Sequence, residues 1–401
     1  MQANWRIGSL LGIPLFLDPS WFFILAFVTY INAQNFSVQF SLGLAWGAGL
    51  AMALLLFASV LLHELGHSVA ALSQGIKVNS ITLFLFGGVA SIEKESKTPG
   101  EAFQVAIAGP AVSFILFGLF YAIAKVLPTS SVGHILTLDL ANINLVLALF
   151  NLIPGLPLDG GQVLKAAVWK LTGSKFQGVR WAALTGKIIG GLAIAFGLSV
   201  LLRGSPFGIW TALIGWFVFR NANAYDRLTT LQEALLQLKA SDAMTREFRV
   251  VDANQTLHSF AQEYILTDTH APLSFYAAAD GRYRGLVAIE DLHFIERSLW
   301  ETQTVESIVR YLSEVTTVEE KTPMLTVINT LESSKENRLT VLSPAGAIAG
   351  VIDRGDIVSA IAKKLSLPIP EEEIKRIKAD GTYPPEFQLG AIAKATTDLE
   401  A

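Results

Sequence analysis

The first 220 residues of this 401-residue chain alternate long apolar runs with short polar stretches. A helix needs about 20 apolar residues to cross the hydrocarbon core of a membrane, and the pattern predicts six such helices, of which the first and the last are short. They cover approximately residues 19–33, 41–73, 102–126, 135–156, 183–202 and 206–220. This half of the chain is therefore expected to be a polytopic α-helical membrane domain.

The charge of the chain changes sign where the apolar runs end. Residues 1–220 carry 12 Lys and Arg against 7 Asp and Glu, whereas residues 221–401 carry 18 against 27. The second half is expected to be soluble, and its mild acidity gives no reason to expect nucleic-acid binding. We divide the chain into a membrane domain (1–225), a helical linker (226–240), a soluble module (241–362) and a C-terminal tail (363–401) that is either disordered or packed elsewhere.

The distribution of Lys and Arg over the loops predicts the orientation of the membrane domain, because cytoplasmic loops carry the excess of positive charge. One side holds Arg6, Lys77, Lys94, Lys97, Lys165, Lys170, Lys175, Arg180, Arg220 and Arg227, and the other holds only Lys125 and Arg203. Both termini are therefore expected in the cytoplasm, and the expected location is a bacterial inner membrane. The N-terminus lacks the layout of a signal peptide, since Asp18-Pro19 interrupts the first apolar run.

Two histidines and a glutamate lie at the end of the second apolar run, as His63-Glu64-Leu-Gly-His67. No charged side chain occurs between Asp18 and Glu64, and an ionisable group at membrane depth costs roughly 2.5–3.5 kcal/mol even on the mildest insertion scale. On a helix, His63 and His67 share one face and can bind one metal ion, with Glu64 beside them. In a soluble protein a chance match would be the ordinary interpretation; the membrane setting favours a metal site.

A third ligand is expected at the same depth on another helix. The chain contains no cysteine, so the ligands must be nitrogen and oxygen atoms. Asp159 ends the stretch Asn-Leu-Ile-Pro-Gly-Leu-Pro-Leu-Asp and follows the fourth apolar run, which travels toward the cytoplasm and reaches the same membrane face as His67. Two histidines, one carboxylate and an open fourth position are typical of a catalytic zinc site. Alone, Asp159 would be interpreted as a helix cap in a turn rich in Pro and Gly.

These motifs resemble those of the site-2 protease class of intramembrane zinc metalloproteases. His63–His67 is similar to the HExxH motif of that class, and Asn151–Gly161 is similar to its NxxPxxPLDG motif. Phe86–Val89 resembles its membrane re-entrant hairpin, and Ala108–Pro110 resembles a Gly-Pro element at the start of its third helix. The resemblance covers approximately residues 5–225. It implies one zinc ion per chain, with His63, His67 and Asp159 as ligands and Glu64 as the general base.

The resemblance also implies that Asn151 and Pro157 contact the substrate. The stretch 77–92 is rich in β-branched and aromatic residues around Gly87 and Gly88, and it predicts a hairpin whose free edge pairs with an extended substrate. A transmembrane helix must unwind before it is cut, because its carbonyl groups are already hydrogen-bonded. We therefore expect single-span membrane proteins with helix-weakening residues as substrates, cleaved near the cytoplasmic face. A hairpin that only anchors the helices at the membrane surface is the alternative.

The soluble module contains an internal repeat of about 60 residues that divides it into segments 241–300 and 301–362. Each unit is expected to contain a helix and two strands, and the order resembles a pair of cystathionine-β-synthase-type (CBS) domains. The resemblance implies adenine-nucleotide binding, with Asp291 and Asp356 holding the ribose, and a homodimer through these domains.

The first repeat lacks the Thr or Ser that such domains usually carry three residues before this Asp, and so does the second. Ala288 and Asp353 take these positions, and an acid would repel a phosphate. A purely structural or dimerising module therefore remains the alternative to nucleotide sensing.

The expected fold is a six-helix membrane domain with a re-entrant β-hairpin, joined to a soluble α+β tandem CBS domain. The expected function is intramembrane zinc proteolysis of transmembrane segments, regulated by the CBS module. A transporter or channel gated by CBS domains is the alternative, but its polar residues should follow a path across the membrane rather than converge at one face. A pseudoprotease that only binds its client is disfavoured, since the three candidate metal ligands and the candidate general base are all present.

Overall fold

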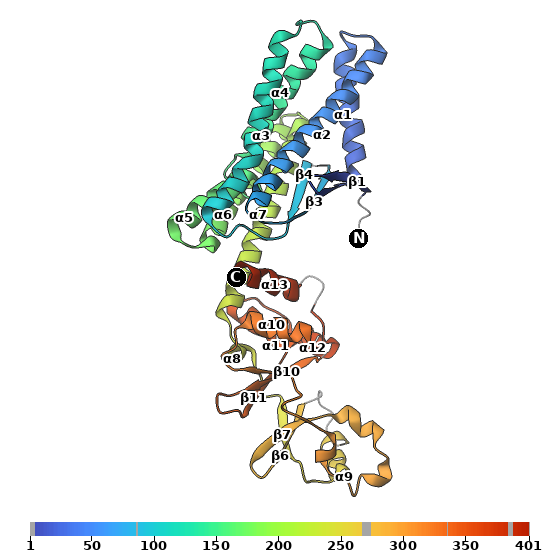
Figure 1. The fold of residues 1–401 in the computed structure, drawn as a ribbon, viewed down its shortest axis with the longest axis vertical. Helices are drawn as coiled ribbons and strands as arrows, with labels where there is room; N and C mark the ends of the chain where they lie inside the picture. The colour runs from blue at the N-terminus through green and yellow to red at the C-terminus, as the bar shows by residue number, and fades with distance from the viewer. Residues whose placement is uncertain (1–4, 86, 267–273, 335, 384–387, 401) are drawn as a thin grey trace. The chain divides into compact units, whose positions relative to one another are not determined.

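The computed structural model describes residues 5–85, 87–266, 274–334, 336–383 and 388–400, which form two compact units with the division between Thr229 and Thr230. We describe each unit by itself (Figure 1). The first unit contains β1 (Trp5–Leu10), β2 (Ile13–Leu17), α1 (Ser20–Ser37), α2 (Leu42–Ser73), β3 (Val78–Phe84), β4 (Gly87–Ile92), α3 (Pro99–Val126), α4 (Val132–Asn151), α5 (Asp159–Thr172), α6 (Lys175–Leu202) and most of α7 (Phe207–Gln237).

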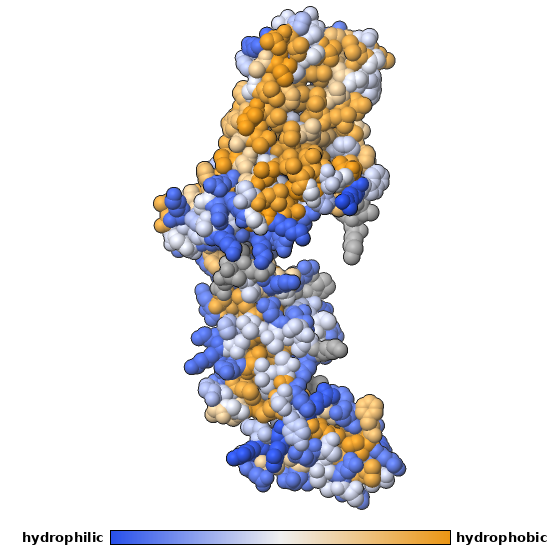
Figure 2. Space-filling view, in the orientation of Figure 1, coloured by the Kyte–Doolittle hydropathy of each residue, from blue (hydrophilic) through white to orange (hydrophobic). Residues whose placement is uncertain are grey.

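Four helices among the described residues, α2, α3, α4 and α6, are long and apolar enough to cross a membrane. Their outward surface is almost uniformly hydrophobic, and hydrophilic side chains gather at the end of the unit that holds α5 and the sheet (Figure 2). Helices α1 and α7, which match the first and last predicted spans, are less apolar because Asn32, Gln34 and Asn35 lie in α1 and Arg220 and Asn221 lie in α7. The protein is a multi-pass membrane protein, and these four helices are its candidate spans.

A four-stranded sheet with the order β1-β2-β3-β4 packs beside α2. The predicted hairpin is its β3–β4 half, paired antiparallel from Val78↔Ile92 to Phe84↔Gly87. Strands β1 and β2 were not expected from the sequence, and the tight turn between them places Leu11 and Gly12 at positive φ. Strand β2 runs parallel to β3, so β4 forms one free edge of the sheet and β1 forms the other.

Several helix boundaries differ from the sequence-based expectation, and two of them concern motifs named above. Gly109-Pro110 was expected at the start of the third helix but lies well inside α3, which begins at Pro99 behind a capping box formed by Thr98 and Glu101. The fourth apolar run was expected to continue to residue 156, but α4 ends at Asn151 and an irregular turn follows. The reason for the second difference is that residues 152–158 contain two prolines and a glycine, which do not continue a helix.

The second unit holds two sheets, β5-β6-β7-β8 and β9-β10-β11. Its elements are α8 (Ala240–Ala243), β5 (Phe248–Asp252), α9 (Leu257–Phe260), η1 (Ala261–Ile265), β6 (Ser274–Ala279), β7 (Arg282–Val287), η2 (Ile289–Phe294), η3 (Arg297–Leu299), η4 (Val305–Ile308), β8 (Val309–Tyr311), β9 (Thr317–Glu319), α10 (Met324–Ser333), β10 (Arg338–Leu342), β11 (Ile348–Asp353), α11 (Arg354–Leu365), α12 (Glu371–Asp380) and α13 (Leu389–Glu400).

The two repeats of this unit exchange their first segments. Strand β8, at the start of the second repeat, pairs with β7 of the first repeat, and Thr245, at the start of the first repeat, forms a bridge with Val351 in β11. Accordingly Val305 and Ile308 belong to the hydrophobic core of the first repeat, whereas Ala240 belongs to that of the second. Each core is thus closed by a segment that lies next to the other repeat in the sequence.

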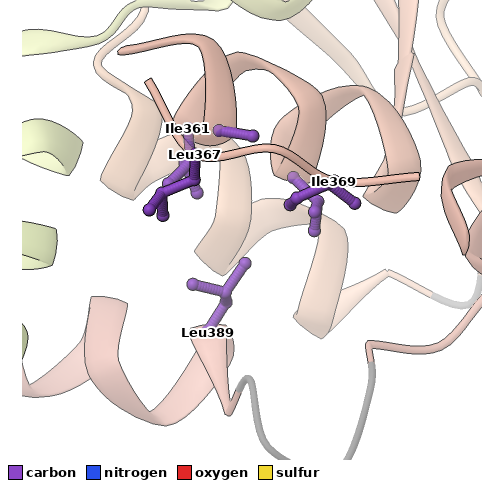
Figure 3. A pocket seen from close by; sticks show the side chains of 6 residues that line it. Ile361, Leu367, Ile369 and Leu389 are labelled. Atoms are coloured by element: carbon purple, nitrogen blue, oxygen red, sulfur yellow. The ribbon is translucent and has the colours of Figure 1, made fainter. Parts of the chain in front are cut away.

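The tail packs on the second repeat. Helix α12 contacts α11, and α13 contacts α10, where Ile377, Leu389 and Ala393 complete the core. Leu389 closes a small apolar cavity between α11 and the chain that follows it, with Ile361, Leu367 and Ile369 on the other walls (Figure 3). Its volume of about 10 Å³ holds about one water molecule, so the tail fills this face of the repeat.

Candidate metal centre

Helix α2 carries the first two candidate ligands. His63 and His67 lie one turn apart on its buried face, since residues i and i+4 of an α-helix share a side. Both side chains are buried, although the helix around them is otherwise apolar. Burying two imidazoles in such a helix costs free energy unless each ring nitrogen has a partner.

Asp159 reaches these histidines because of the turn that precedes α5. Leu156 N–H donates to the Ala182 carbonyl of α6, which holds the turn against that helix. A Cβ on Gly160 would lie 2.2 Å from the Leu152 carbonyl oxygen, and one on Gly161 would lie 2.4 Å from Gly155, so only glycines let the turn fold this closely over the start of α5. Asp159 is the first residue of that helix, where the N-terminal end of the helix dipole favours a carboxylate.

Three side-chain atoms converge at this point. Nε2 of His63 and Nε2 of His67 lie 3.1 and 3.3 Å from Oδ2 of Asp159, and the two nitrogens lie 3.3 Å from each other. Zinc binds such atoms at 2.0–2.2 Å in a tetrahedral arrangement, which separates neighbouring ligand atoms by about 3.4 Å. The triangle therefore has the size of one face of a zinc coordination sphere, and these residues form the candidate metal-binding group of the described residues.

The far ring nitrogens are held by α3. His67 Nδ1 lies 2.7 Å from the Val105 carbonyl oxygen, and His63 Nδ1 lies 2.9 Å from the hydroxyl of Ser113. A carbonyl can only accept, so Nδ1 of His67 carries the proton and Nε2 presents its lone pair to the site. This is how proteins orient histidine ligands of metals. The arrangement suits a metal ion better than a hydrogen-bonded pair of histidines.

Helix α3 approaches α2 closely through two glycines. A Cβ on Gly109 would lie 2.2 Å from Nε2 of His67, and one on Gly66 would lie 2.8 Å from Val112 and 2.9 Å from the Ala108 carbonyl oxygen. No side chain other than hydrogen fits at Gly109 unless the imidazole moves. The Gly-Pro element identified in the sequence therefore makes room for the candidate ligands.

Glu64 lies beside the edge strand and is close enough to His63, His67 and Asp159 to interact with them electrostatically. A Cβ on Gly88 would lie 2.6 Å from Cγ of Glu64, and the Glu64 carboxyl group interacts with the backbone of Ala90 in β4. The free edge of the sheet thus runs directly beside the expected general base. Gly87, at φ 136°, starts this strand in a conformation that other residues rarely adopt.

The structure also locates the other predicted substrate residues. Asn151 is the last residue of α4, and Pro157 lies two residues before Asp159; both are partly buried. They stand at the two ends of the turn that positions Asp159.

The candidate nucleotide residue of the second repeat is engaged by the chain itself. Asp356 is only 3% exposed; its Oδ1 lies 2.7 Å from Nζ of Lys378 in α12, and its Oδ2 accepts from the backbone N–H of Asp353. Asp353 in turn accepts from the Asp356 N–H and pairs with Arg338 at 3.0 Å. The acid that replaces the usual Thr or Ser is therefore the N-cap of α11.

The charges of this cluster interact strongly. Burial, together with the negative charge of Asp353, raises the pKa of Asp356 to about 6, although Lys378 acts to lower it. Burial alone would lower the pKa of Lys378, but hydrogen bonds to Asp356 and Glu247 raise it. In the first repeat, Asp291 is partly exposed and lies 3.6 Å from Arg310, so the two predicted ribose ligands have different surroundings.

Several residues of the site were not identified from the sequence. Ser113 and the Val105 carbonyl belong to a helix whose sequence carries no motif for them, and only a prediction of how α2 and α3 cross would have found them. Lys165 and Glu95, which form an ion pair near α5, were counted only as loop charges. Their separation of 70 residues in the sequence gives no local signal.

The chain matches two protein-family models and several known proteins. The model of Peptidase family M50 matches residues 51–139 and 128–196, and the CBS domain model matches residues 305–363. The chain is 43% identical over 364 residues to sll0528 of Synechocystis sp., covering 90% of this chain and 96% of that protein. It is 28% identical to zinc metalloprotease MJ0392 of Methanocaldococcus jannaschii, covering 90% and 97%.

A solved structure, that of the site-2 protease from Methanocaldococcus jannaschii, is 31% identical and covers 56% of this chain and 95% of that one, with a TM-score of 0.43. The family model and the curated relatives named above are those of zinc metalloproteases, and members of this family use zinc. The chain belongs to Peptidase family M50, the site-2 protease family of zinc metalloproteases, and it carries a CBS domain in its second unit.

Proposed function

We propose that this protein is an intramembrane protease that hydrolyses transmembrane segments of single-span membrane proteins close to the cytoplasmic face. The observation that carries this proposal is the triangle of ligand atoms from His63, His67 and Asp159, which lies between helices long and apolar enough to cross a membrane. A soluble protease has no need to bury its metal ligands among such helices.

One zinc ion per chain fits the three ligand atoms and would be held by them. When bound, zinc polarises a carbonyl group and lowers the pKa of water to about 7. Nδ1 of His67 donates to Val105, and this contact keeps the imidazole turned toward the site. The carboxylate of Asp159 supplies the negative charge that a dication requires.

Glu64 is the proposed general base. It does not share the triangle of ligand atoms, so its carboxylate is free to take a proton from the attacking water and to pass it to the nitrogen of the leaving amine. Its position beside Gly88 and Ala90 supports this role, because a peptide bond next to β4 would lie within its reach.

Substrate would bind as an added strand at β4. The free edge of this strand offers backbone donors and acceptors, and an unwound transmembrane segment has the same groups to pair. We propose that Gly87 and Gly88 let the substrate backbone approach, and that Asn151 and Pro157 contact it near the turn before Asp159. Irregular backbone at membrane depth is tolerated where it is buried in protein or lines a water-filled cavity, as an active site requires.

The proposed membrane topology has six spans, with α1 and α7 added to the four candidate spans, and the β3–β4 hairpin re-entering the membrane. Both termini would lie in the cytoplasm of a bacterial cell, with the inner membrane as the host. A reporter fused at the C-terminus should therefore report the cytoplasm and one near Ser131 the far side. Opposite signals at either position would contradict the six-span arrangement.

The CBS module is the proposed regulator of the protease, with adenine nucleotides and a second copy of the chain as its candidate partners. Asp291 is accessible to a ribose, whereas Asp356 is bound by Lys378. We propose that nucleotide binding in the second repeat requires Lys378 to leave Asp356, and that the first repeat is open without such a change.

The proposed activity is tested with purified full-length protein and a single-span test protein that carries an Asn-Pro pair near the cytoplasmic end of its membrane segment. Wild type should cut it, and Glu64→Gln should retain zinc while losing nearly all turnover, because the proton acceptor is gone. Cleavage by Glu64→Gln at the wild-type rate would contradict the assigned chemistry.

A second variant addresses the edge strand. Val89→Pro removes a backbone donor from β4 and should cut turnover by about tenfold while zinc stays bound. Unchanged turnover in this variant and in a proline scan of the neighbouring strand positions would show that β4 does not hold the substrate.

A further inference from the structure

A small ion cluster lies outside the metal centre, where β4 leads into α3. Oε2 of Glu95 lies 2.7 Å from Nζ of Lys165 in α5 and 2.9 Å from Nζ of Lys175 at the start of α6. The Lys165 side chain is only 8% exposed, whereas the Glu95 side chain is 53% exposed. The Glu95 carboxylate therefore forms ion pairs with two lysine ammonium groups, and the Lys165 side chain is almost fully buried.

The two sides of this cluster belong to the two halves of the candidate active site. Glu95 follows β4 by three residues, and β4 contacts Glu64 through Gly88. Lys165 lies on α5, the helix that begins with Asp159. The cluster thus links the strand beside the general base to the helix that presents the third metal ligand.

The rest of the loop from β4 to α3 is bound to different helices. The Ser96 hydroxyl donates to the side chain of Gln74 at the end of α2, and the Gln74 amide donates to the carbonyl of Glu101 in α3. The Glu101 carboxylate accepts from the backbone N–H groups of Lys97 and Thr98. These contacts hold the loop on α2 and α3, and Glu95 adds the link to α5 and α6.

We propose that Glu95 is a positioning residue. Through its ion pairs with Lys165 and Lys175 it fixes the position of the edge strand β4 relative to the metal centre, and so determines how well an extended substrate binds. This inference rests on the proposed function. It assigns to Glu95 no contact with substrate or metal: Glu95 acts by fixing the distance between β4 and α5.

The chemistry of the cluster fits a permanent link. Burial alone would raise the pKa of Glu95, but the charges of Lys165 and Lys175 outweigh it and hold this pKa at about 2. The carboxylate is therefore ionised at every pH at which a protease would work. Among the described residues Lys165 has no other anionic partner, so it would lose its counter-charge if Glu95 were neutral. A buried cation without a partner is unfavourable.

The test compares Glu95→Gln with a charge exchange, Glu95→Lys combined with Lys165→Glu, which keeps one carboxylate and two ammonium groups in the cluster. Glu93→Gln is the matched control, because Glu93 is exposed in the same loop. Each full-length variant is assayed for zinc content and for kcat and KM on the single-span test protein described above.

Glu95→Gln should raise KM by about fivefold, the size expected for one partly exposed charge interaction, with kcat within twofold of wild type and zinc retained. The charge exchange should bring KM back to within about twofold of wild type, and Glu93→Gln should leave both constants unchanged. A merely structural role would lower zinc content or kcat together with the folded fraction, and it would not produce a shift in KM alone.

Two outcomes would overturn the inference while leaving the protease assignment intact: an unchanged KM in Glu95→Gln, or a raised KM that the charge exchange does not restore. If wild type itself does not cut the test protein and Glu64→Gln behaves identically, the proposed function fails instead. The wild-type and Glu64→Gln measurements therefore separate the two cases before Glu95 is judged.

Discussion

Both units of the protein hold a carboxylate in a cluster of polar side chains, partly buried at Asp159 and buried at Asp356, but they neutralise it differently. In the first unit, Asp159 meets two imidazoles, one of which is fixed with its lone pair toward the carboxylate. In the second unit, Asp356 meets the ammonium group of Lys378, supplied by the chain's own tail. The first cluster gathers electron-pair donors, with no Lys or Arg paired to Asp159 among the residues that the structure describes, whereas the second contains its cation.

This difference separates a ligand site from a structural ion pair. A buried carboxylate requires a positive charge nearby. Where the neighbouring groups are themselves potential donors to a metal, a dication at tetrahedral distances satisfies all three atoms. Where a lysine fills the place, the carboxylate is already satisfied and any external ligand must displace it. Both aspartates stood out in the sequence, and only the structure distinguishes their surroundings.

The largest expected effect follows from a substitution at Gly109, beside the metal ligands of the first unit. Gly109→Ala places a methyl group where Nε2 of His67 lies, so the imidazole must turn away and the triangle opens. We expect most of the zinc to be lost and turnover to fall by about 100-fold or more, since displacing a catalytic group by about 1 Å costs that much. Zinc content and cleavage rate are measured on the same sample.

The control for this substitution is Gly118→Ala on the same helix, where nothing lies within 4 Å of the added methyl group. It should keep zinc and activity. Full zinc binding by Gly109→Ala would show that α3 does not approach the ligands as closely as described.

A smaller effect is expected in the second unit, where removing Lys378 leaves the Asp356 carboxylate without its ammonium partner. Asp356 has a folded pKa of about 6 against 3.8 for the free group, so ionising it opposes folding, and stability falls as pH rises from 3.8 through about 6. Lys378→Met raises this pKa further, which extends the fall to higher pH. We expect a loss of about 2 kcal/mol at pH 8 and a clearly smaller loss at pH 5, where Asp356 is mostly protonated.

Thermal unfolding of the full-length variant at the two pH values checks this. Lys375→Met is the control, because Lys375 is exposed on the same helix. An equal loss of stability at pH 5 and pH 8 would show that Lys378 contributes packing rather than charge.

The smallest expected effect concerns nucleotides. If Lys378 occupies the place of a ligand in the second repeat, Lys378→Met should bind AMP, ADP or ATP a few times more tightly than wild type, and Asp356→Asn in the same background should cancel the gain. Titration calorimetry on the full-length protein measures both. Identical affinities, or no binding by any variant, would favour a dimerising or docking module. Light scattering then tests whether the full-length protein forms a homodimer.

Much of the membrane unit could be predicted from local sequence. Apolar runs longer than a membrane is thick predict α2, α3, α4 and α6. The spacing of two histidines one helical turn apart predicts the candidate metal ligands of α2. The strands β1 and β2 escaped prediction because both are short, and Ile13–Leu17 is apolar at every position, without alternation to a polar face. The contacts of Ser113 and Glu95 escaped because they depend on how helices cross, which no local pattern encodes.

The second unit was less accessible to sequence-based reasoning. The repeat was identified, yet the exchange of first segments was not, since it pairs residues such as Thr245 and Val351 that are far apart in the chain. The position of Lys378 beside Asp356 depends on a tail for which the sequence left disorder and packing equally open. An Asp in a family motif therefore predicts a ligand-binding site only if the residues that contact it in the fold do not already occupy it.

The most direct test of the central claim is the zinc content of four purified full-length proteins: wild type, Glu64→Gln, Asp159→Asn and Asp356→Asn. Asp159 and Asp356 are each replaced by the uncharged amide of the same shape, so the comparison isolates the two buried carboxylates. The account predicts about one zinc per chain in wild type, Glu64→Gln and Asp356→Asn, and well below half in Asp159→Asn. A wild type that cleaves without zinc, or an Asp159→Asn variant that keeps a full complement, would contradict it.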